Sequence, residues 1–185
     1  MSEIFSKILS TGSYLPEKIL TNHDIEKIVD TSHDWIVERT GIEQRHIASD
    51  DESSVDMAYG ASMRALKSAS LNPEDIDMIV LATTTPERKF PSTAVLLQNK
   101  LKINQGFAFD VNAACTGFVY AIDIADKYIK GGFVKNVLVV GTEKISSLLD
   151  WKDRNTCVLF GDGAGAIILS ASNEQGIISS TIGSD

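Results

Sequence analysis

The chain has 185 residues, and its 43% hydrophobic and 23% charged residues are close to the averages of globular domains. These fractions exclude a disordered, collagen-like or coiled-coil chain. The formal net charge of −8, from 17 Lys and Arg against 25 Asp and Glu, argues against nucleic-acid binding, which usually relies on a basic surface. No apolar run approaches the roughly 18 residues of a membrane span, and no signal peptide is evident, so we expect a cytoplasmic protein.

Strands and helices are expected to alternate along the chain. Their hydrophobic periodicity predicts, in chain order, a strand at 4–12, helices at 23–29, 32–39 and 53–70, a strand at 76–84, a helix at 91–101, a strand at 107–111, a helix at 113–130, and strands at 137–143, 164–172 and 176–184. The central strands are continuous apolar runs, which is typical of strands covered on both faces. The pattern therefore predicts an α/β fold in which helices sandwich a mostly parallel sheet.

Several of the helices carry residues that favour a helix end. Asn22 is a candidate N-cap of the first helix, and Thr31 or Ser32 of the second, which Gly41 would end. Pro91 is expected in the first turn of the helix that it opens, where proline is tolerated.

The predicted helix at 113–130 lacks charge in its first turns. No charged residue occurs between Asp110 and Asp123. A helix that is uncharged on every side is usually buried on every side, and one sheet covers only one of its faces. The sequence therefore implies a second covering layer, which the predicted sheet does not supply.

Cys115 is the strongest candidate for a nucleophile. It follows a buried strand and lies near the start of the helix at 113–130, and ligands of open α/β sheets bind outside the carboxyl ends of the strands. The positive end of the helix dipole favours the thiolate, which is the reactive form, and small alanine and glycine neighbours leave room beside it. The alternative is a small core residue, the commoner role of a free cysteine.

The second cysteine and the glycine-rich segment after it favour structural roles. Three apolar residues follow Cys157, so core packing is its expected role, and a redox partnership with Cys115 is disfavoured. The segment GDGAG at 161–165 lacks the lysine of a phosphate loop and precedes a strand rather than a helix, which excludes that motif. We expect a tight turn that allows close backbone packing.

The usual partner of a cysteine nucleophile is not evident. In acyl transfer such a cysteine normally works with a histidine base. All three histidines, His23, His33 and His46, lie in the first 46 residues on predicted helices or loops with polar neighbours. Surface exposure is expected for each of them, and none is placed beside Cys115.

Two pairs of aromatic and basic residues stand out, and the first is a candidate for nucleotide recognition. Trp35 and Arg39 are four residues apart and so share one face of the predicted helix, where an indole and a guanidinium can stack a purine and pair with a phosphate. An amphipathic helix with Trp35 as a core residue fits the spacing equally well. Trp151 and Arg154 lie in the polar segment 150–156, which we expect to be a loop.

Five longer stretches are specific enough to identify a family. They are TGSYLPE (11–17), VDTSHDWIVERTGIEQRHIA (29–48), ATTTPERKFPSTA (82–94), FDVNAACTGFVYA (109–121) and FGDGAGA (160–166). In order and spacing they resemble the N-terminal half of the β-ketoacyl-[acyl-carrier-protein] synthase III family, which are condensing enzymes with the thiolase fold. The segment DWIVERTGI distinguishes this family from related polyketide-type and hydroxymethylglutaryl-CoA synthases, which share the cysteine–helix arrangement.

The resemblance implies roles for individual residues. Cys115 matches the nucleophile that accepts the acyl group. Trp35, Arg39 and Arg154 match residues that hold the adenine end of coenzyme A. Phe90 matches an aromatic residue that reaches across a homodimer interface into the partner's acyl pocket.

The resemblance also implies that an important part of the enzyme lies elsewhere. The family's complete fold has two related halves stacked as five αβαβα layers, and residues 1–185 match the half that carries the nucleophile. The catalytic histidine and asparagine belong to the other half, as does a backbone donor of the oxyanion hole. We therefore expect the C-terminal half to be absent from this chain, which would explain both the missing base and the uncovered helix, and we expect these residues alone not to complete the reaction.

The implied enzyme is an acyltransferase that starts fatty-acid synthesis by a decarboxylating condensation. Its cysteine thiolate attacks acetyl-CoA or another short acyl-CoA, and an oxyanion hole stabilises the tetrahedral intermediate. The acyl-enzyme then reacts with malonyl-acyl carrier protein, which loses carbon dioxide. The resemblance implies no metal and no redox cofactor.

The implied partners are the acyl-CoA, the carrier protein and a second copy of the chain in a homodimer, with neither nucleic acid nor a membrane. Arg45, Arg64 and Lys67 are candidates for a basic patch that meets the acidic carrier protein, with ordinary solvated surface as the alternative. A different possibility is a non-catalytic assembly or binding module that pairs with a separate subunit bearing the second half.

Overall fold

The computed structural model describes residues 4–183. At its centre is a mixed sheet in the order β1-β7-β6-β4-β5, formed by β1 (Phe5–Tyr14), β7 (Asp162–Ser172), β6 (Asn136–Lys144), β4 (Met78–Ala82) and β5 (Phe107–Val111). Strand β4 is parallel to β5 and β6, whereas β7 is antiparallel to β6 and β1. Four of the five strands therefore run in one direction, which confirms the predicted α/β fold with a mostly parallel sheet.

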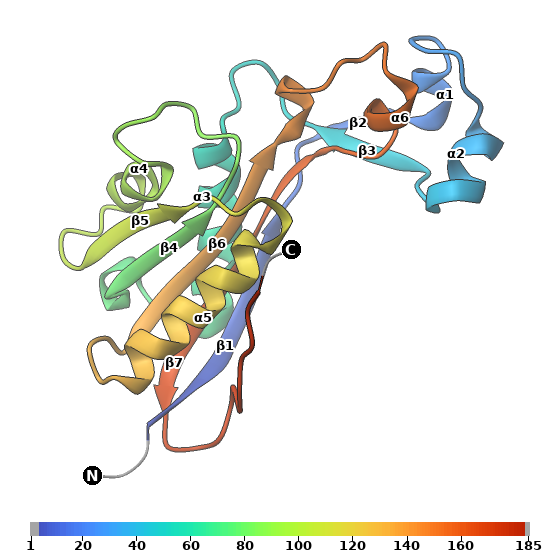
Figure 1. Ribbon diagram of the computed structural model, residues 1–185. Helices are drawn as coiled ribbons and strands as arrows, with labels where there is room; N and C mark the ends of the chain where they lie inside the picture. The colour runs from blue at the N-terminus through green and yellow to red at the C-terminus, as the bar shows by residue number, and fades with distance from the viewer. Residues whose placement is uncertain (1–3, 184–185) are drawn as a thin grey trace.

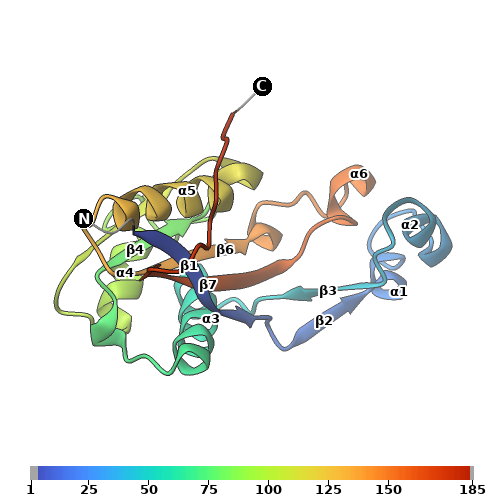
Figure 2. The same ribbon diagram turned by 90° about the horizontal axis from the view of Figure 1, so that it is seen from below.

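Helices cover both faces of this sheet (Figures 1 and 2). Helix α5 (Gly117–Lys130) lies on one face, and α3 (Ser54–Ala69) and α4 (Thr93–Lys100) lie on the other. Successive side chains of a central strand point to opposite faces, so that Val137 packs in the cluster under α5 and Leu138 in the cluster under α3. Burial on both faces explains why these strands read as continuous apolar runs.

Helix α3 is held against the sheet by its cap and by a glycine. The Ser53 side chain accepts a hydrogen bond from the backbone N–H of Asp56, whose carboxylate accepts one from the backbone N–H of Ser53 at 2.8 Å. Gly12 of β1 lies directly under the helix, where a Cβ would clash with backbone atoms of Ala61 and Ala65. Only glycine permits so close an approach of the helix to the strand.

A smaller lobe projects from the end of the sheet at which β6 finishes (Figure 1). It consists of the antiparallel strands β2 (Lys18–Thr21) and β3 (Gln44–Ile47) and the short helices α1 (Asn22–Ile25), α2 (His33–Thr40) and α6 (Arg154–Cys157). The lobe has its own buried core, made of Ile25, Ile36, Cys157 and Val158. It is therefore built from two parts of the chain that are far apart in sequence.

The structure corrects the sequence prediction in the less buried segments. The pattern does not reveal β2 and β3, and the segment expected to be a loop around Arg154 contains helix α6. The strand expected at 176–184 is wrong for the described residues, since residues 173–183 form neither a helix nor a strand. Ser184 lies outside the described residues. The segment GDGAG at 161–165 is not a tight turn, since Asp162 already begins β7. Close backbone packing does occur there, because a Cβ on Gly161 would lie 2.8 Å from the Cβ of Arg45.

Several helix ends also differ from their predicted positions. The N-cap of α1 is Thr21 rather than Asn22. Helix α2 has the predicted caps Ser32 and Gly41, the latter with a left-handed φ of 70°. Helix α4 begins after its N-cap Ser92, so the proline at position 91 precedes the helix and does not lie in its first turn.

The helix expected at 113–130 is divided. A 3-10 turn, Ala114–Thr116, precedes α5, which begins at Gly117. The expectation of burial on every side is wrong for the described residues, because the side chain of Val119 remains 54% exposed. A second covering layer for this face stays a prediction.

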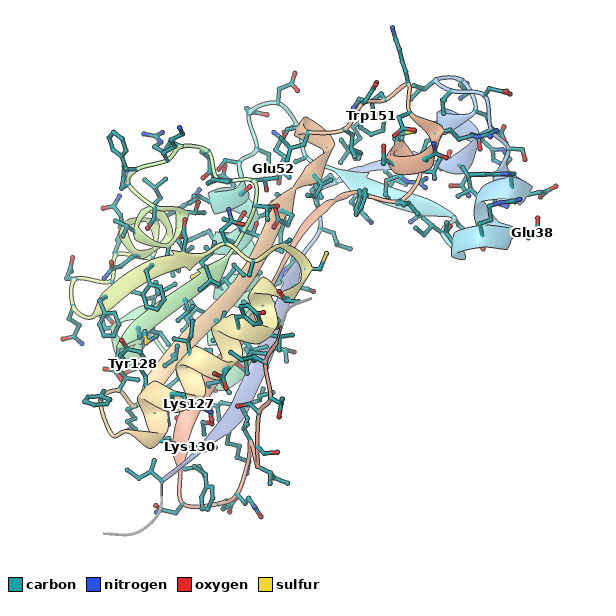
Figure 3. The ribbon with its side chains drawn as sticks, viewed as in Figure 1. Glu38, Glu52, Lys127, Tyr128, Lys130 and Trp151 are labelled. Carbon is teal, nitrogen blue, oxygen red and sulfur yellow. The ribbon has the colours of Figure 1, made fainter. Side chains whose placement is uncertain are left out.

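A buried carboxylate on α5 ties the C-terminal segment to the sheet. Asp126, 1% exposed, accepts hydrogen bonds from the Ser6 hydroxyl and from Lys127 Nζ at 3.3 Å, and forms an ion pair with Lys130 Nζ at 3.0 Å. Lys130 also donates to the carbonyl oxygen of Ile177 at 3.0 Å. Figure 3 labels both lysines along α5. The residues after β7 are thus held by side chains of the helix and by one backbone hydrogen bond, from the N–H of Ile177 to the carbonyl oxygen of Ser6 in β1 at 2.8 Å, rather than by a ladder of strand pairing.

The charge of Asp126 makes part of the stability depend on pH. Burial opposes ionisation, but the hydrogen bonds from Ser6 and the two lysines outweigh it and hold the pKa of Asp126 below its ordinary value of 3.8. A carboxyl group with a lowered pKa stabilises the fold above pH 3.8, and that contribution is lost as the pH falls toward the lower, folded-state pKa. We expect Asp126→Asn to lower the free energy of unfolding at pH 7 by about 1–3 kcal/mol and to flatten its acid dependence.

Urea unfolding at pH 3 to 7 would measure this effect, with Asp50→Asn, a change at an exposed carboxylate, as the control. An Asp126→Asn variant as stable as the parent at pH 7 would contradict the stabilising role of this buried charge.

Candidate active site

A cavity of about 700 Å³ opens at the edge where the parallel strands β4, β5 and β6 end. Because the carboxyl ends of parallel strands meet at one edge, residues that follow each strand are brought together there. The lining residues are Leu15, Ala82, Thr84, Ala114, Cys115, Phe118, Gly141, Thr142, Glu143, Ile145, Phe160, Gly161, Gly163, Ala164 and Gly165. The cavity is mostly apolar and contains the cysteine that the sequence singles out.

Cys115 lies in the 3-10 turn between β5 and α5, and its side chain is exposed to the cavity. The residue before it, Ala114, has a left-handed φ of 45°, a conformation that is uncommon outside glycine and often found at functional sites. The thiol therefore stands ahead of the N-terminus of a 14-residue helix, where the dipole favours a negative charge. This placement confirms the location at a strand end, whereas the role of Cys115 as a nucleophile stays a prediction.

Two glycines allow the start of α5 to approach the strand ends. A Cβ on Gly117 would lie 3.2 Å from the Cβ of Ala82 at the end of β4. A Cβ on Gly141 in β6 would lie 3.2 Å from the ring of Phe118. Larger residues at these positions would push the helix, and with it the thiol, away from the sheet.

No histidine contributes to the lining of this cavity. His23 and His33 belong to the lobe, and His46 lies in β3. The expectation that all three are exposed holds only for His23, because His33 and His46 are half-buried. Phe90, predicted to reach a partner subunit, is 83% exposed and is not a lining residue.

The lobe brings together the three residues that the resemblance assigns to coenzyme A. The guanidinium carbon of Arg39 lies 4.5 Å from the centre of the Trp35 ring, and that of Arg154 lies 4.8 Å from it. Both distances are in the range of cation–π attraction. Arg154 comes from α6, which Asp153 caps. We name these three residues, Trp35, Arg39 and Arg154, the indole–guanidinium cluster. Its role in binding coenzyme A stays a prediction.

A buried arginine holds the two parts of the lobe together. Arg45, 6% exposed, donates from Nη1 to Asn22 Oδ1 at 2.8 Å and from Nη2 to the carbonyl oxygen of Val158 at 2.7 Å. Burial lowers its pKa. The expectation that Arg45 belongs to a basic surface patch is therefore wrong, and only Arg64 and Lys67 are exposed, both on α3.

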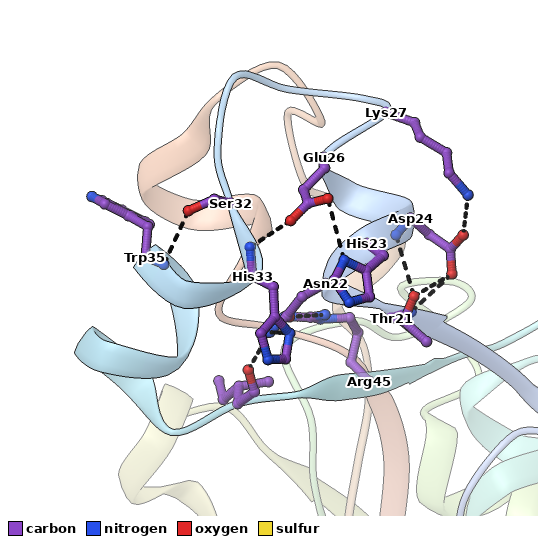
Figure 4. A network of polar contacts seen from close by, with 11 residues as sticks. Thr21, Asn22, His23, Asp24, Glu26, Lys27, Ser32, His33, Trp35 and Arg45 are labelled. Atoms are coloured by element: carbon purple, nitrogen blue, oxygen red, sulfur yellow. Dashed lines mark hydrogen bonds and ion pairs between the residues drawn. The ribbon is translucent and has the colours of Figure 1, made fainter.

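A network of polar contacts fixes the start of α2 (Figure 4). Glu26 accepts a hydrogen bond from the backbone N–H of His33 at 2.5 Å and contacts His23 Nδ1 at 3.3 Å, and these contacts hold the pKa of Glu26 below its usual range. The two imidazole rings stack 4.9 Å apart. The Ser32 hydroxyl accepts from the backbone N–H of Trp35 at 3.1 Å. The orientation of Trp35 thus depends on several residues of the preceding turn.

Two acidic residues near the cavity escape the sequence analysis. Glu143 lines the cavity at the end of β6. Asp162, 5% exposed, accepts hydrogen bonds from the backbone N–H groups of Ala48 at 2.7 Å and Ser146 at 2.8 Å, which joins β3 to the segment after β6. The available signal was an acidic residue one or two positions after a glycine, a pattern that many exposed acidic residues share.

Within residues 4–183, no cluster of three or more histidine, cysteine or acidic side chains is arranged to hold a metal ion. Among the helices described, none is both long and apolar enough to cross a membrane.

Known proteins are similar to this chain in sequence. Residues 109–185 match the family described as 3-oxoacyl-[acyl-carrier-protein (ACP)] synthase III. The chain is 57% identical over 182 residues to the β-ketoacyl-[acyl-carrier-protein] synthase III of Xanthomonas oryzae pv. oryzae. The aligned residues make up 98% of this chain and 56% of that protein. The protein of the same name from Ehrlichia canis is 56% identical over 182 residues, covering 97% of this chain and 57% of its own length. The chain thus spans about half the length of the curated relatives it matches.

Solved structures agree with the sequence comparison. The 3-oxoacyl-[acyl-carrier-protein] synthase III of Aquifex aeolicus superposes with a TM-score of 0.89 at 56% identity, covering 91% of this chain and 55% of that one. The priming β-ketosynthase of the R1128 polyketide biosynthetic pathway superposes with a TM-score of 0.92 at 38% identity, covering 95% and 52%. These neighbours confirm the thiolase-like fold.

The two cysteines differ in accessibility, which predicts their reactivity. Cys157 is fully buried in the core of the lobe, as predicted, and burial, with Asp153 nearby, raises the pKa of its thiol. Cys115 is exposed. We expect iodoacetamide to alkylate Cys115 at least about tenfold faster than Cys157, because reaction requires an accessible thiolate.

Peptide mass spectrometry of the folded protein would measure both rates. A Cys115→Ser variant should take up no label until urea exposes the second thiol. Equal labelling of the two cysteines in the folded protein would contradict the placement of Cys157.

Proposed function

The chain belongs to the β-ketoacyl-[acyl-carrier-protein] synthase III family, and we propose that it forms the nucleophile-bearing, N-terminal half of such a condensing acyltransferase. The proposed reaction joins acetyl-CoA, or another short acyl-CoA, to malonyl-acyl carrier protein and so starts fatty-acid synthesis. The observation that carries the proposal is the exposed thiol of Cys115 in an apolar cavity at the carboxyl edge of a parallel sheet.

The first step transfers the acyl group to Cys115. The thiolate attacks the carbonyl carbon of the thioester, and the resulting tetrahedral oxyanion collapses with release of the coenzyme A thiolate, which takes up a proton. The N-terminus of α5 supports the thiolate through the helix dipole. The apolar walls around Cys115, including Phe118, Ile145 and Phe160, suit a short hydrocarbon chain.

The second step forms the carbon–carbon bond. The malonyl carboxylate leaves as carbon dioxide, and the bonding electrons form an enolate that attacks the acyl carbonyl carbon. The bond to Cys115 sulfur then breaks, which regenerates the thiolate and releases the β-ketoacyl carrier protein. Because no histidine lines the cavity, we infer that the histidine and asparagine that stabilise the enolate come from sequence outside these residues. Both steps balance without a metal or redox cofactor.

The indole–guanidinium cluster is the proposed binding site for the adenine end of coenzyme A. The flat indole of Trp35 offers a stacking surface, and the guanidinium groups of Arg39 and Arg154 lie within 5 Å of it. Guanidinium groups pair well with phosphate because their donors match its oxygen atoms. Phe160 and Gly161, which follow α6 closely, line the thiol cavity, so the chain connects the two sites directly.

The remaining proposals concern partners and location. We expect a cytoplasmic homodimer in which Phe90, 83% exposed, reaches the partner's acyl pocket. Arg64 and Lys67 remain candidates for contact with the acidic carrier protein.

The main alternative is a non-catalytic assembly or binding half that works with a separate second subunit. The lack of a histidine in the cavity favours it. A single natural reading frame that continues past Asp185 and contains the family's histidine and asparagine motifs would exclude this alternative. A separate neighbouring frame encoding that half would support it.

Acylation of Cys115 tests the proposed function. We expect the natural full-length protein, incubated with acetyl-CoA, to gain one acetyl group on this residue, measured by intact-mass and peptide mass spectrometry. Cys115→Ser should gain none, and the 185-residue chain alone should give no β-ketoacyl product. Absence of an acetyl group on Cys115, or condensation by the short chain alone, would contradict the corresponding part of the proposal.

A second prediction concerns Trp35. Trp35→Ala removes the stacking surface, so we expect KM for acetyl-CoA to rise about tenfold or more, which corresponds to about 1.4 kcal/mol, with little change in kcat at saturation. Trp35→Phe, which keeps an aromatic face for stacking, is the matched control and should keep most of the affinity for acetyl-CoA. An unchanged KM in Trp35→Ala would refute the assignment.

A further inference from the structure

One charged side chain lies in the wall of the thiol cavity. Among the lining residues within 4–183, only Cys115 and Glu143 have ionisable side chains; most of the others are apolar residues or glycine. Glu143 stands near the end of β6, beside the turn that follows β4. Neither acyl transfer nor the condensation described above uses this carboxylate.

The carboxyl group of Glu143 is held in place by hydrogen bonds and has no counter-ion beside it within residues 4–183. Its carboxylate accepts hydrogen bonds from the Thr84 backbone N–H at 2.8 Å, the Thr85 hydroxyl at 2.6 Å and the Thr84 hydroxyl at 3.1 Å. All of these partners are neutral donors, as an ionised carboxylate requires. Within residues 4–183 Glu143 forms no ion pair. The neighbouring Lys144 donates instead to the carbonyl oxygens of Ser49 at 2.6 Å and Glu52 at 2.7 Å.

We infer that Glu143 is a specificity-determining residue that keeps acyl groups bearing a carboxylate from being loaded onto Cys115. A carboxylate on an acyl group carried by Cys115 would lie in the cavity whose wall contains Glu143, where the described residues supply no counter-ion, so it is repelled and loses hydration. A neutral acyl group meets neither cost. In the condensation the malonyl group stays on the carrier protein and its carboxylate leaves as carbon dioxide, so it is never attached to this sulfur. The inference rests on the proposed function, since it concerns the acyl group that the thiol accepts.

The proposed reaction requires the thiol to distinguish a neutral acyl group from a malonyl group. Its two acyl groups are both carried as thioesters, and a malonyl group differs from an acetyl group by one carboxylate in place of a hydrogen. Thioester exchange with a malonyl donor would block the Cys115 sulfur with the wrong group. Charge distinguishes the two acyl groups independently of their size.

The test compares loading of Cys115 from malonyl-CoA with loading from propionyl-CoA, which has the same number of carbon atoms and no carboxylate. Initial rates are measured on the natural full-length protein by peptide mass spectrometry, which separates a malonyl adduct from the acetyl adduct that decarboxylation would give. In Glu143→Gln, which keeps the shape and can still hydrogen bond to the threonines, we expect the malonyl-to-propionyl rate ratio to rise at least about tenfold.

Two variants serve as controls. Glu143→Asp retains the charge, so it should keep the discrimination of the parent even if its hydrogen bonds are weaker. Glu74→Gln neutralises an exposed carboxylate outside the cavity and should leave the ratio unchanged.

A comparison that needs no variant uses carbamoylacetyl-CoA, in which a neutral amide replaces the malonyl carboxylate. The unaltered protein should load this group at least about tenfold faster than the malonyl group. Equal loading of these two groups, or an unchanged ratio in Glu143→Gln, would overturn the inference while the proposed function stands. If no acyl donor modifies Cys115, the proposed function fails and the inference fails with it.

Discussion

The contact between the start of α5 and the ends of β4 and β6 determines where the thiol lies. Gly117 and Gly141 remove the side chains that would otherwise separate the helix from these strands. The helix can then begin directly above the carboxyl edge of the sheet, and the 3-10 turn before it places Cys115 in the cavity. The rest of the wall follows from the strand directions, because the parallel strands end at this edge and the antiparallel β7 begins there.

The lobe depends on a different kind of interaction. Its core is small, and the Arg45 side chain connects β2, α1 and the residue after α6 through carbonyl and amide oxygens. A buried guanidinium with such partners is costly to leave unsatisfied, so the three elements it joins are held in one arrangement. That arrangement brings Arg154 to the ring of Trp35. The cluster is therefore positioned by a residue that contributes nothing to its surface.

The parts of the fold that could be predicted from sequence are those where local pattern and burial agree. Residues 137–140 of the strand predicted at 137–143 form an unbroken apolar run because α5 and α3 bury alternate side chains. The segment predicted as a strand at 176–184 has a similar β-branched composition, but side chains of α5 hold residues 177–183. No local sequence pattern distinguishes a segment that joins the sheet from one that packs on a helix. Strands β2 and β3 are only four residues long and mostly polar, so they have too few residues to show a period.

The residues of the candidate site likewise fall into those that the sequence reveals and those that it does not. Cys115 could be found because its signal is local, a cysteine between a buried strand and a helix. Glu143 could not, because its surroundings come from threonines 58 to 60 positions earlier in the chain. Arg45 was misplaced for the same reason, since its burial depends on Val158, 113 positions later. The burial and hydrogen bonding of a residue cannot be predicted from local sequence when they depend on contact with a segment far away in the chain.

The divided composition of the lobe has a consequence for synthesis of the protein. Trp35 leaves the ribosome early, but Arg154 lies 154 − 35 = 119 residues later, between β6 and β7. The N-terminal part of the lobe therefore lacks the core residues Cys157 and Val158 until α6 and the residue after it have been synthesised. Contacts of such long sequence separation form late because closing the intervening chain has an entropic cost. We therefore expect the nascent chain to acquire its indole–guanidinium cluster only after α6 has been synthesised, and to leave a small apolar surface of the lobe uncovered until then.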